Sequence, residues 1–226
     1  MRTLIIFWAF FIFPFTLLAQ SGSDALSQVT LAMANQNWDK ATVFFHKAVT
    51  ADVAKSEMYY WTEVDKNSTV CPLLARELAL SYQNARNYDK AYLFYKELTQ
   101  MQPSNIANLL ACGNMEMLRG KEKDALILYE KVIEIDRDNL SANIFVGNFY
   151  YLSAEQEKEK IETDFKKISA PTRMQYARYR DSLNRVVATG YSKAKQYLQN
   201  VLQHFPSVEA QKTLDKIQLI EKAINR

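Results

Sequence analysis

Apolar and small residues recur along this chain at spacings of three and four, which places them on one face of an α-helix. From residue 72 onward the pattern also repeats as a whole, with a period of 34 residues. Three successive copies of its first half carry Leu78, Ala79 and Tyr82, then Cys112, Gly113 and Glu116, then Val146, Gly147 and Tyr150. Each copy therefore predicts short helices that bury their apolar stripes against each other and against the next pair.

Small residues at fixed points of the repeat would let neighbouring helices approach closely. They are Ala79, Gly113 and Gly147 in the first helix, and Ala91 and Ala125 in the second. A 34-residue period with these positions resembles the tetratricopeptide repeat family. The resemblance covers most of the chain after residue 20. It implies an all-α solenoid of helix-turn-helix units, a right-handed superhelix whose first helices line a concave groove.

The repeats are predicted at residues 22–50, 72–105, 106–139 and 140–206. Ala41 of the first repeat and Ala91 of the second are 50 residues apart, so an insertion lies between them. We expect it to form an extra helical turn or a short helix, followed by a loop. Its Tyr59, Tyr60 and Trp61 cannot all face inward on one helix. Either these aromatics cover the edge of the solenoid, or one or more of them forms an exposed contact patch.

A second insertion interrupts the fourth repeat, because Ala125 and Ala194 are 69 residues apart, 35 more than one period. The extra residues, 154–188, are rich in helix-forming Glu and Lys, and their apolar residues are spaced for two helices. The sequence therefore predicts a protruding helical hairpin. Its removal restores the period, so we expect it to be a surface feature only. An amphipathic helix at residues 207–226 fits the terminal cap that a solenoid needs.

Residues 1–20 resemble a secretory signal peptide, with Arg2 before an apolar run and the small Ala19 at the expected cleavage site. Leu17 fits the cleavage pattern poorly, so membrane association through an uncleaved leader stays open. The pattern predicts an exported protein of the periplasm or cell envelope of a Gram-negative bacterium.

Charge and composition argue against several kinds of chemistry. The formal net charge of +3 is too small for a nucleic-acid interface. His46 and His204 lie far apart and lack neighbouring ligands, so we expect no metal site. Cys71 and Cys112 either form a disulfide or, for Cys112, fill a small core position. With no catalytic motif or cofactor signature present, we expect a non-catalytic protein without a small-molecule substrate.

The resemblance implies that a protein or peptide partner binds in the groove. The positions that would face this groove are Arg76, Leu80, Gln83, Leu110, Asn114, Met117, Phe145, Asn148 and Tyr151. Leu110 and Phe145 have an alternative role in packing between adjacent repeats. The expected function is a protein-interaction scaffold or adaptor of the cell envelope. The alternative is a structural subunit or accessory chain that docks through the inserted hairpin.

Overall fold

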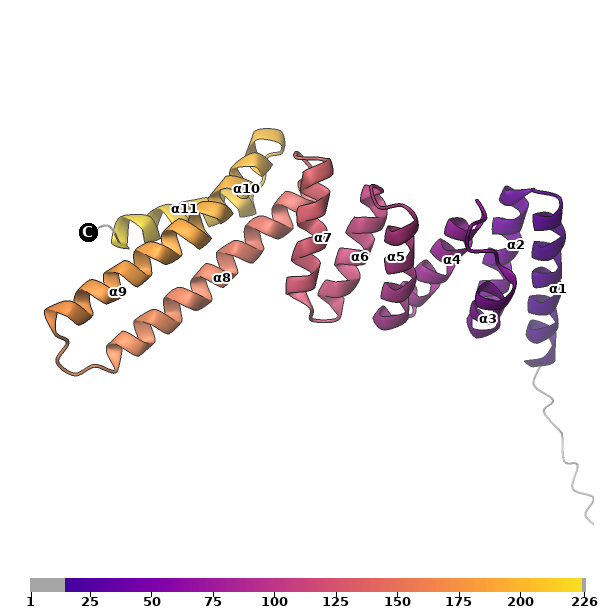
Figure 1. The fold of residues 1–226 in the computed structure, drawn as a ribbon, viewed down its shortest axis with the longest axis horizontal. Helices are drawn as coiled ribbons and strands as arrows, with labels where there is room; N and C mark the ends of the chain where they lie inside the picture. Colours follow the sequence, from indigo (N-terminus) through magenta and orange to yellow (C-terminus); the bar gives the residue numbers. More distant parts are fainter. Residues whose placement is uncertain (1–14, 225–226) are drawn as a thin grey trace, which may run out of the picture. The chain divides into compact units, whose positions relative to one another are not determined.

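The structure, a computed structural model, describes residues 15–224, which form two compact units that divide after Met101 (Figure 1). No β-strand occurs among these residues. The predicted all-α repeat fold, with a protruding helical hairpin and a C-terminal capping helix, is confirmed.

The first unit is built from two helix pairs with one helix between them. Its elements are α1 (Phe15–Ala34), α2 (Trp38–Ala51), α3 (Val53–Glu63), α4 (Cys71–Asn84) and α5 (Tyr88–Met101). α1 packs against α2 and α4 against α5, while α2 also packs against α4. Phe45 and Phe94 are among the largest fully buried side chains of this core.

Helix α3 is the first inserted segment. It begins directly after α2 because Asp52 serves both helices. The backbone N–H of Asp52 bonds to the carbonyl of Ala48 at 2.8 Å and ends α2. The carboxylate of Asp52 accepts from the backbone N–H of Lys55 at 2.9 Å and begins α3. The insertion is thus a short helix followed by a loop, as predicted.

The consecutive aromatics of α3 divide between the core and the surface. Tyr60 is 0% exposed, and its hydroxyl lies 3.1 Å from the Cys71 sulfur, whereas Trp61 is 49% exposed. Trp61 stacks on Phe94 with ring centroids 5.6 Å apart. Lys66, from the following loop, places its ammonium 3.2 Å from the ring centroid of Tyr60 and 4.1 Å from that of Trp61. The insertion therefore covers part of the core and also leaves an aromatic surface.

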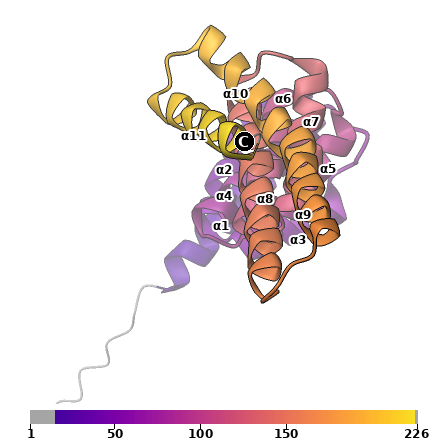
Figure 2. The same ribbon diagram turned by 90° about the vertical axis from the view of Figure 1, so that its left-hand side faces the viewer.

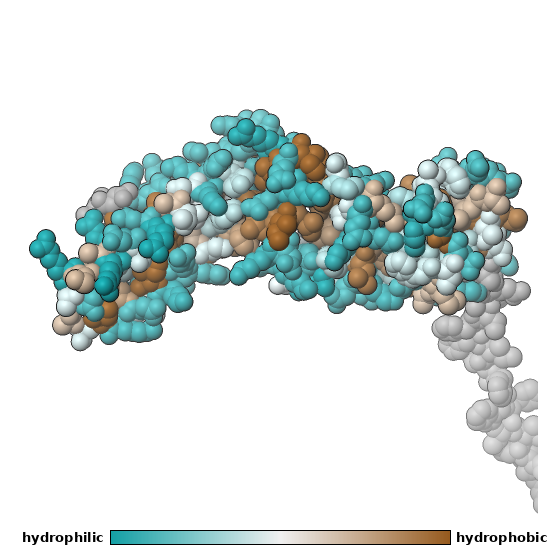
Figure 3. Space-filling view, viewed as in Figure 1, coloured by the Kyte–Doolittle hydropathy of each residue, from teal (hydrophilic) through white to brown (hydrophobic). Residues whose placement is uncertain are grey.

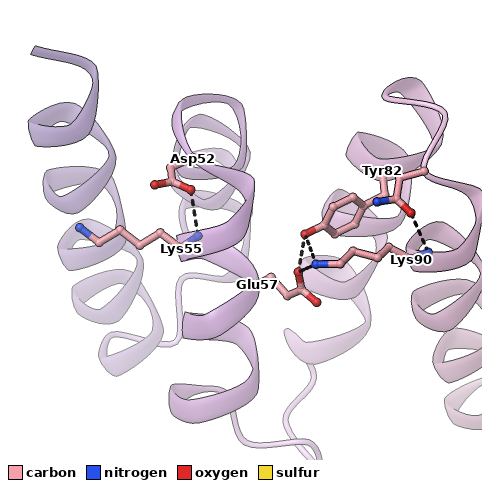
Figure 4. Close-up of polar contacts among 6 residues, drawn as sticks. Asp52, Lys55, Glu57, Tyr82 and Lys90 are labelled. Carbon is pink, nitrogen blue, oxygen red and sulfur yellow. Dashed lines mark hydrogen bonds and ion pairs between the residues drawn. The ribbon is translucent and has the colours of Figure 1, made fainter. Parts of the chain in front are cut away.

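A polar cluster joins α3 to α4 and α5 (Figure 4). Lys90 donates to Glu57 at 2.6 Å and to the hydroxyl of Tyr82 at 3.3 Å, and that hydroxyl donates to the same carboxylate oxygen. Burial opposes ionisation of Glu57, but the hydrogen bonds from Lys90 and Tyr82 outweigh it and hold the pKa of Glu57 below its usual value. The carboxylate therefore stays ionised and links three helices.

The second unit contains two regular pairs, the hairpin and the cap. Its elements are α6 (Ile106–Leu118), α7 (Glu122–Ile135), α8 (Leu140–Lys166), α9 (Arg173–Val186), the π-helical turn η1 (Val187–Tyr191), α10 (Ser192–His204) and α11 (Val208–Ile224). α6 packs against α7, α7 against α8, and α8 against α10. The terminal helix α11 packs on α10 and also touches α9, and both lie beside it in Figure 2.

The hairpin consists of the outer part of α8 and all of α9, which lie side by side in both views (Figures 1 and 2). Thr172 begins α9 with a capping box, in which Gln175 bonds back to the Thr172 backbone. Phe165 stacks on Tyr179 with ring centroids 4.1 Å apart and holds the two legs together.

The base of the hairpin belongs to the core. Ala154 is 2% exposed and Val186 is 0% exposed, and both pack in one cluster with Tyr191, Leu198 and Ile217. The expectation that residues 154–188 form only a surface feature is therefore wrong at this end. The boundary at Ala154 lies inside the packed core, whereas Ala188 at the other boundary is exposed.

The expected leader, residues 1–20, lies mostly outside the described residues, and α1 begins at Phe15. Export and cleavage near Ala19 therefore stay predictions. Among the helices of residues 15–224, none is both long enough and apolar enough to cross a membrane.

Candidate functional site

Two exposed asparagines mark equivalent places in the second unit. Asn114 lies on α6 and Asn148 on α8, separated by one 34-residue period, and both are exposed. Neither side-chain amide has a hydrogen-bond partner within residues 15–224. Each amide offers two donor hydrogens and one acceptor oxygen. The structure thus leaves unused hydrogen-bonding groups at the same position of two successive repeats.

The apolar neighbours of these asparagines are half-buried. Leu110, Met117 and Phe145 pack against a buried cluster of α6, α7 and α8. Phe145 stacks on Tyr129 with ring centroids 4.1 Å apart and an angle of 22° between the rings. Packing between adjacent helices therefore uses one side of each of these three residues. The exposed side of each residue has a fixed orientation, because packing of the buried side fixes the side-chain rotamer.

Tyr151 continues this surface one turn beyond Asn148. It is half-buried, and its ring lies tilted against Tyr191 with centroids 6.2 Å apart. Burial, together with the nearby charge of Glu155, raises the pKa of Tyr151. The side chain is therefore a neutral phenol at any physiological pH, suited to apolar contact and hydrogen bonding.

The first unit holds the other three expected residues. Gln83 is already engaged, since its amide oxygen accepts from the Tyr95 hydroxyl at 2.7 Å. Arg76 is half-buried, and Leu80 is 41% exposed. These three positions of the first unit thus present one exposed apolar side chain, Leu80, and a Gln83 amide whose oxygen is already engaged.

Leu80 lines a hollow of about 670 Å³ between α2, the start of α3 and α4. Its other lining residues are His46, Val49, Thr50, Ala51, Asp52, Val53, Glu77, Ser81 and Asn84. Across it, His46 Nδ1 lies 2.7 Å from Glu77 Oε2. The repeat pattern could not predict this hollow, because part of the hollow's wall is the turn at Asp52, where the insertion begins.

The side chains that could react or bind a metal, namely Cys, His, Asp and Glu, are used in packing or lie at the surface. Cys71 and Cys112 are both buried and both free thiols. Burial raises the pKa of Cys71, with a hydrogen bond from Tyr60 acting in the opposite direction. No group of three His, Cys, Asp or Glu side chains in residues 15–224 is arranged to hold a metal ion. Cys112 fills the small core position expected from the repeat.

Comparisons with known proteins place the fold in context. No protein-family model matches the chain. A crystal structure of a "putative protein binding protein" from Bacteroides ovatus is 54% identical and covers 90% of this chain and 98% of its own, with a TM-score of 0.80. A tetratricopeptide repeat protein from Parabacteroides merdae is 14% identical, covers 90% of this chain and 74% of its own, and has a TM-score of 0.40. The MamA protein is 11% identical over 91% of each chain, with a TM-score of 0.38.

The similarity to the Bacteroides ovatus protein extends over nearly the whole of that chain, so the two proteins share one family and one fold. The helix pairs α4–α5 and α6–α7 carry the 34-residue period at the packing positions where helices touch. Gly113 and Gly147 are buried at two of those contacts, where an added Cβ would lie 3.0 Å from Tyr129 and 2.9 Å from Leu198. This chain belongs to the same family as the Bacteroides ovatus protein, and its repeated helix pairs have the tetratricopeptide type of packing.

Proposed function

We propose that this protein is a non-catalytic interaction scaffold of the cell envelope, which binds an extended peptide segment of a partner across the first helices of its repeats. The observation that carries the proposal is the pair of unused amides of Asn114 and Asn148, exposed one repeat apart. The description of the Bacteroides ovatus relative as a protein-binding protein supports a protein partner. The envelope location rests on the pattern of residues 1–20.

The chemistry of this surface suits a peptide backbone. An extended peptide presents N–H and C=O groups at regular intervals, and each Asn side chain pairs with one of each. Met117 and Tyr151 flank the amides with apolar surface for the side chains of the peptide. Because packing already fixes these residues, binding loses little side-chain entropy.

Replacing both asparagines tests the proposal. We expect Asn114→Ala/Asn148→Ala to leave the melting temperature nearly unchanged, because both side chains are exposed and make no hydrogen bond within residues 15–224. A peptide selected on the wild-type protein from a random display library should bind this variant at least tenfold more weakly, about 1.4 kcal/mol. Fluorescence anisotropy with the labelled peptide measures the loss.

The matched control is Gln203→Ala/Gln218→Ala, which removes two exposed amides from α10 and α11. This variant should bind the peptide as tightly as the wild-type protein. Equal affinity of the asparagine variant and the wild type, or a loss in the control, would place the binding surface elsewhere.

A further inference from the structure

The outward face of α9 carries a regular pattern that the groove does not use. Residues at alternating spacings of three and four form a strip, here called the α9 seam: Met174, Ala177, Asp181 and Asn184 on α9, and Ala188 in the adjoining turn η1. Four arginines flank this strip, here called the flanking arginines: Arg173, Arg178, Arg180 and Arg185. All nine residues are exposed, while Leu183 and Val186 on the opposite face are buried.

This arrangement has the spacing of coiled-coil core positions over two heptads, with Met or Ala at three of its five positions and Asp and Asn at the other two. When Met174 takes the first core position, a, the α9 seam fills successive a and d positions, and all four flanking arginines fall at e and g. In a coiled coil the a and d residues meet the partner helix, and the e and g residues form ion pairs with it. The exposed face of α9 thus combines heptad spacing with charged side chains on both borders.

The flanking arginines are free to bind an external group. None of the four forms an ion pair with a carboxylate within residues 15–224. The other leg of the hairpin differs, since Lys158 pairs with Glu155 at 3.3 Å and Lys167 with Asp164 at 2.8 Å. Four of the ten arginines of the chain lie in the 13 residues from 173 to 185, against one acidic residue there. The positive charge of α9 is therefore concentrated, and its four arginines form no ion pair within the described residues.

We infer that the α9 seam is a second docking site, which binds an acidic amphipathic helix of a partner protein in coiled-coil fashion. The partner helix would carry Glu or Asp at its e and g positions, opposite the flanking arginines. The guanidinium group favours this pairing because it binds a carboxylate with two parallel hydrogen bonds. The small Ala177 and Ala188 leave room for larger apolar side chains from the partner.

The polar seam residues restrict which helix fits. Asp181 and Asn184 lie in the middle of the α9 seam and are exposed. A polar residue at an a position reduces affinity but sets the register of the two helices. The partner should therefore place an Asn or Lys opposite Asp181, so that no unpaired carboxylate is buried in the contact.

The composition of the seam does not fit a lipid surface. Helices that lie on membranes place bulky Trp, Phe or Leu side chains in the contact face. The α9 seam has Ala, Asn and Asp at four of its five positions. The hydropathy of the hairpin surface is correspondingly mixed, with hydrophobic patches between hydrophilic ones (Figure 3).

The probe for this site is a synthetic three-heptad peptide with Leu at a and d, one Asn at a central a position, and Glu at e and g. Such a peptide stays monomeric because its own e and g charges repel. A second peptide of the same composition has the Leu and Glu positions scrambled out of the heptad. A third has Lys in place of every Glu. Binding of each to the full chain is measured by fluorescence anisotropy at low salt.

We expect the heptad Glu peptide to bind at least tenfold more tightly than the scrambled peptide. The variant with all four flanking arginines replaced by Glu should lose this binding and bind the Lys peptide instead. Its fold is checked by circular dichroism, since the replaced side chains are all exposed. The Asn114→Ala/Asn148→Ala variant should bind the Glu peptide normally, so this test does not depend on the groove.

Equal binding of the heptad and scrambled peptides would show that α9 is only a basic patch and overturn the proposal. Absence of binding to the Glu peptide would also overturn it. If the peptide does not bind but vesicles rich in phosphatidylserine do, and the Arg→Glu variant does not bind them, the surface belongs to a membrane contact instead.

Discussion

Tyr60→Ala should lower the free energy of unfolding by about 3–5 kcal/mol, the usual cost of removing a large buried aromatic side chain. Tyr60 is 0% exposed and packs edge-on against Phe94, with ring centroids 5.7 Å apart. The substitution leaves a cavity and also removes the hydroxyl beside the Cys71 sulfur. Urea unfolding followed by circular dichroism measures the loss.

The neighbouring Trp61→Ala is the control, because Trp61 is an even larger aromatic residue on the same helix but is 49% exposed. We expect Trp61→Ala to lower the free energy of unfolding clearly less than Tyr60→Ala does, because about half of the Trp61 surface is already in contact with water in the folded protein. Equal losses for the two variants would show that α3 does not divide its aromatics between core and surface. A negligible loss for Tyr60→Ala would show that α3 is not packed on the first unit.

Gly190→Ala should destabilise the base of the hairpin by about 1–3 kcal/mol, the usual cost of overpacking. A Cβ at this position would lie 2.6 Å from the Cβ of Ala154, and neither atom has a flexible side chain that can move aside. Helices α8 and α10 would have to separate around η1, where Tyr191 of η1 and Ala194 of α10 are buried. Thermal unfolding should show a melting temperature lower by about 2–4 °C for each kcal/mol.

A compensating substitution distinguishes this clash from a general effect of the π-helical turn. Ala154→Gly removes the atom that the new Cβ would strike, so the double variant Ala154→Gly/Gly190→Ala should regain most of the loss. Thr189→Ala, next to Gly190 but exposed, should have little effect on the melting temperature. No recovery in the double variant would mean that the backbone of η1, rather than the contact with Ala154, requires glycine.

The regular part of this fold is readable from the sequence because each repeat buries the same positions. Leu78, Ala79 and Val146, which the 34-residue pattern singled out, are each 0% exposed. The hairpin was also predictable from the sequence, because Ala125 and Ala194 are 35 residues further apart than one period requires. These extra residues provide one helical segment for each leg of the hairpin. Periodicity is informative here because neighbouring repeats provide the same environment each time.

The insertions were harder to predict because they have no counterpart in other repeats. The burial of Tyr60 rather than Trp61 depends on Phe94 and Cys71, which lie on other helices. The π-helical turn η1 and the burial of Ala154 likewise depend on contacts between segments about 35 residues apart. The three- and four-residue spacing of the α9 seam is also present in the sequence. Only the exposure of these residues in the structure distinguishes the seam from the buried face of the same helix.

The peptide-binding surface is the central claim, and photocrosslinking tests it most directly. Benzoylphenylalanine is introduced at one position at a time, and the labelled display-selected peptide is added to the full chain. We expect crosslinks from Asn114 and Asn148, which are exposed on α6 and α8, and none from Gln203 on α10 or Arg180 on α9. A crosslink from Gln203 or Arg180, with none from the two asparagine positions, would contradict binding across the first helices of the repeats.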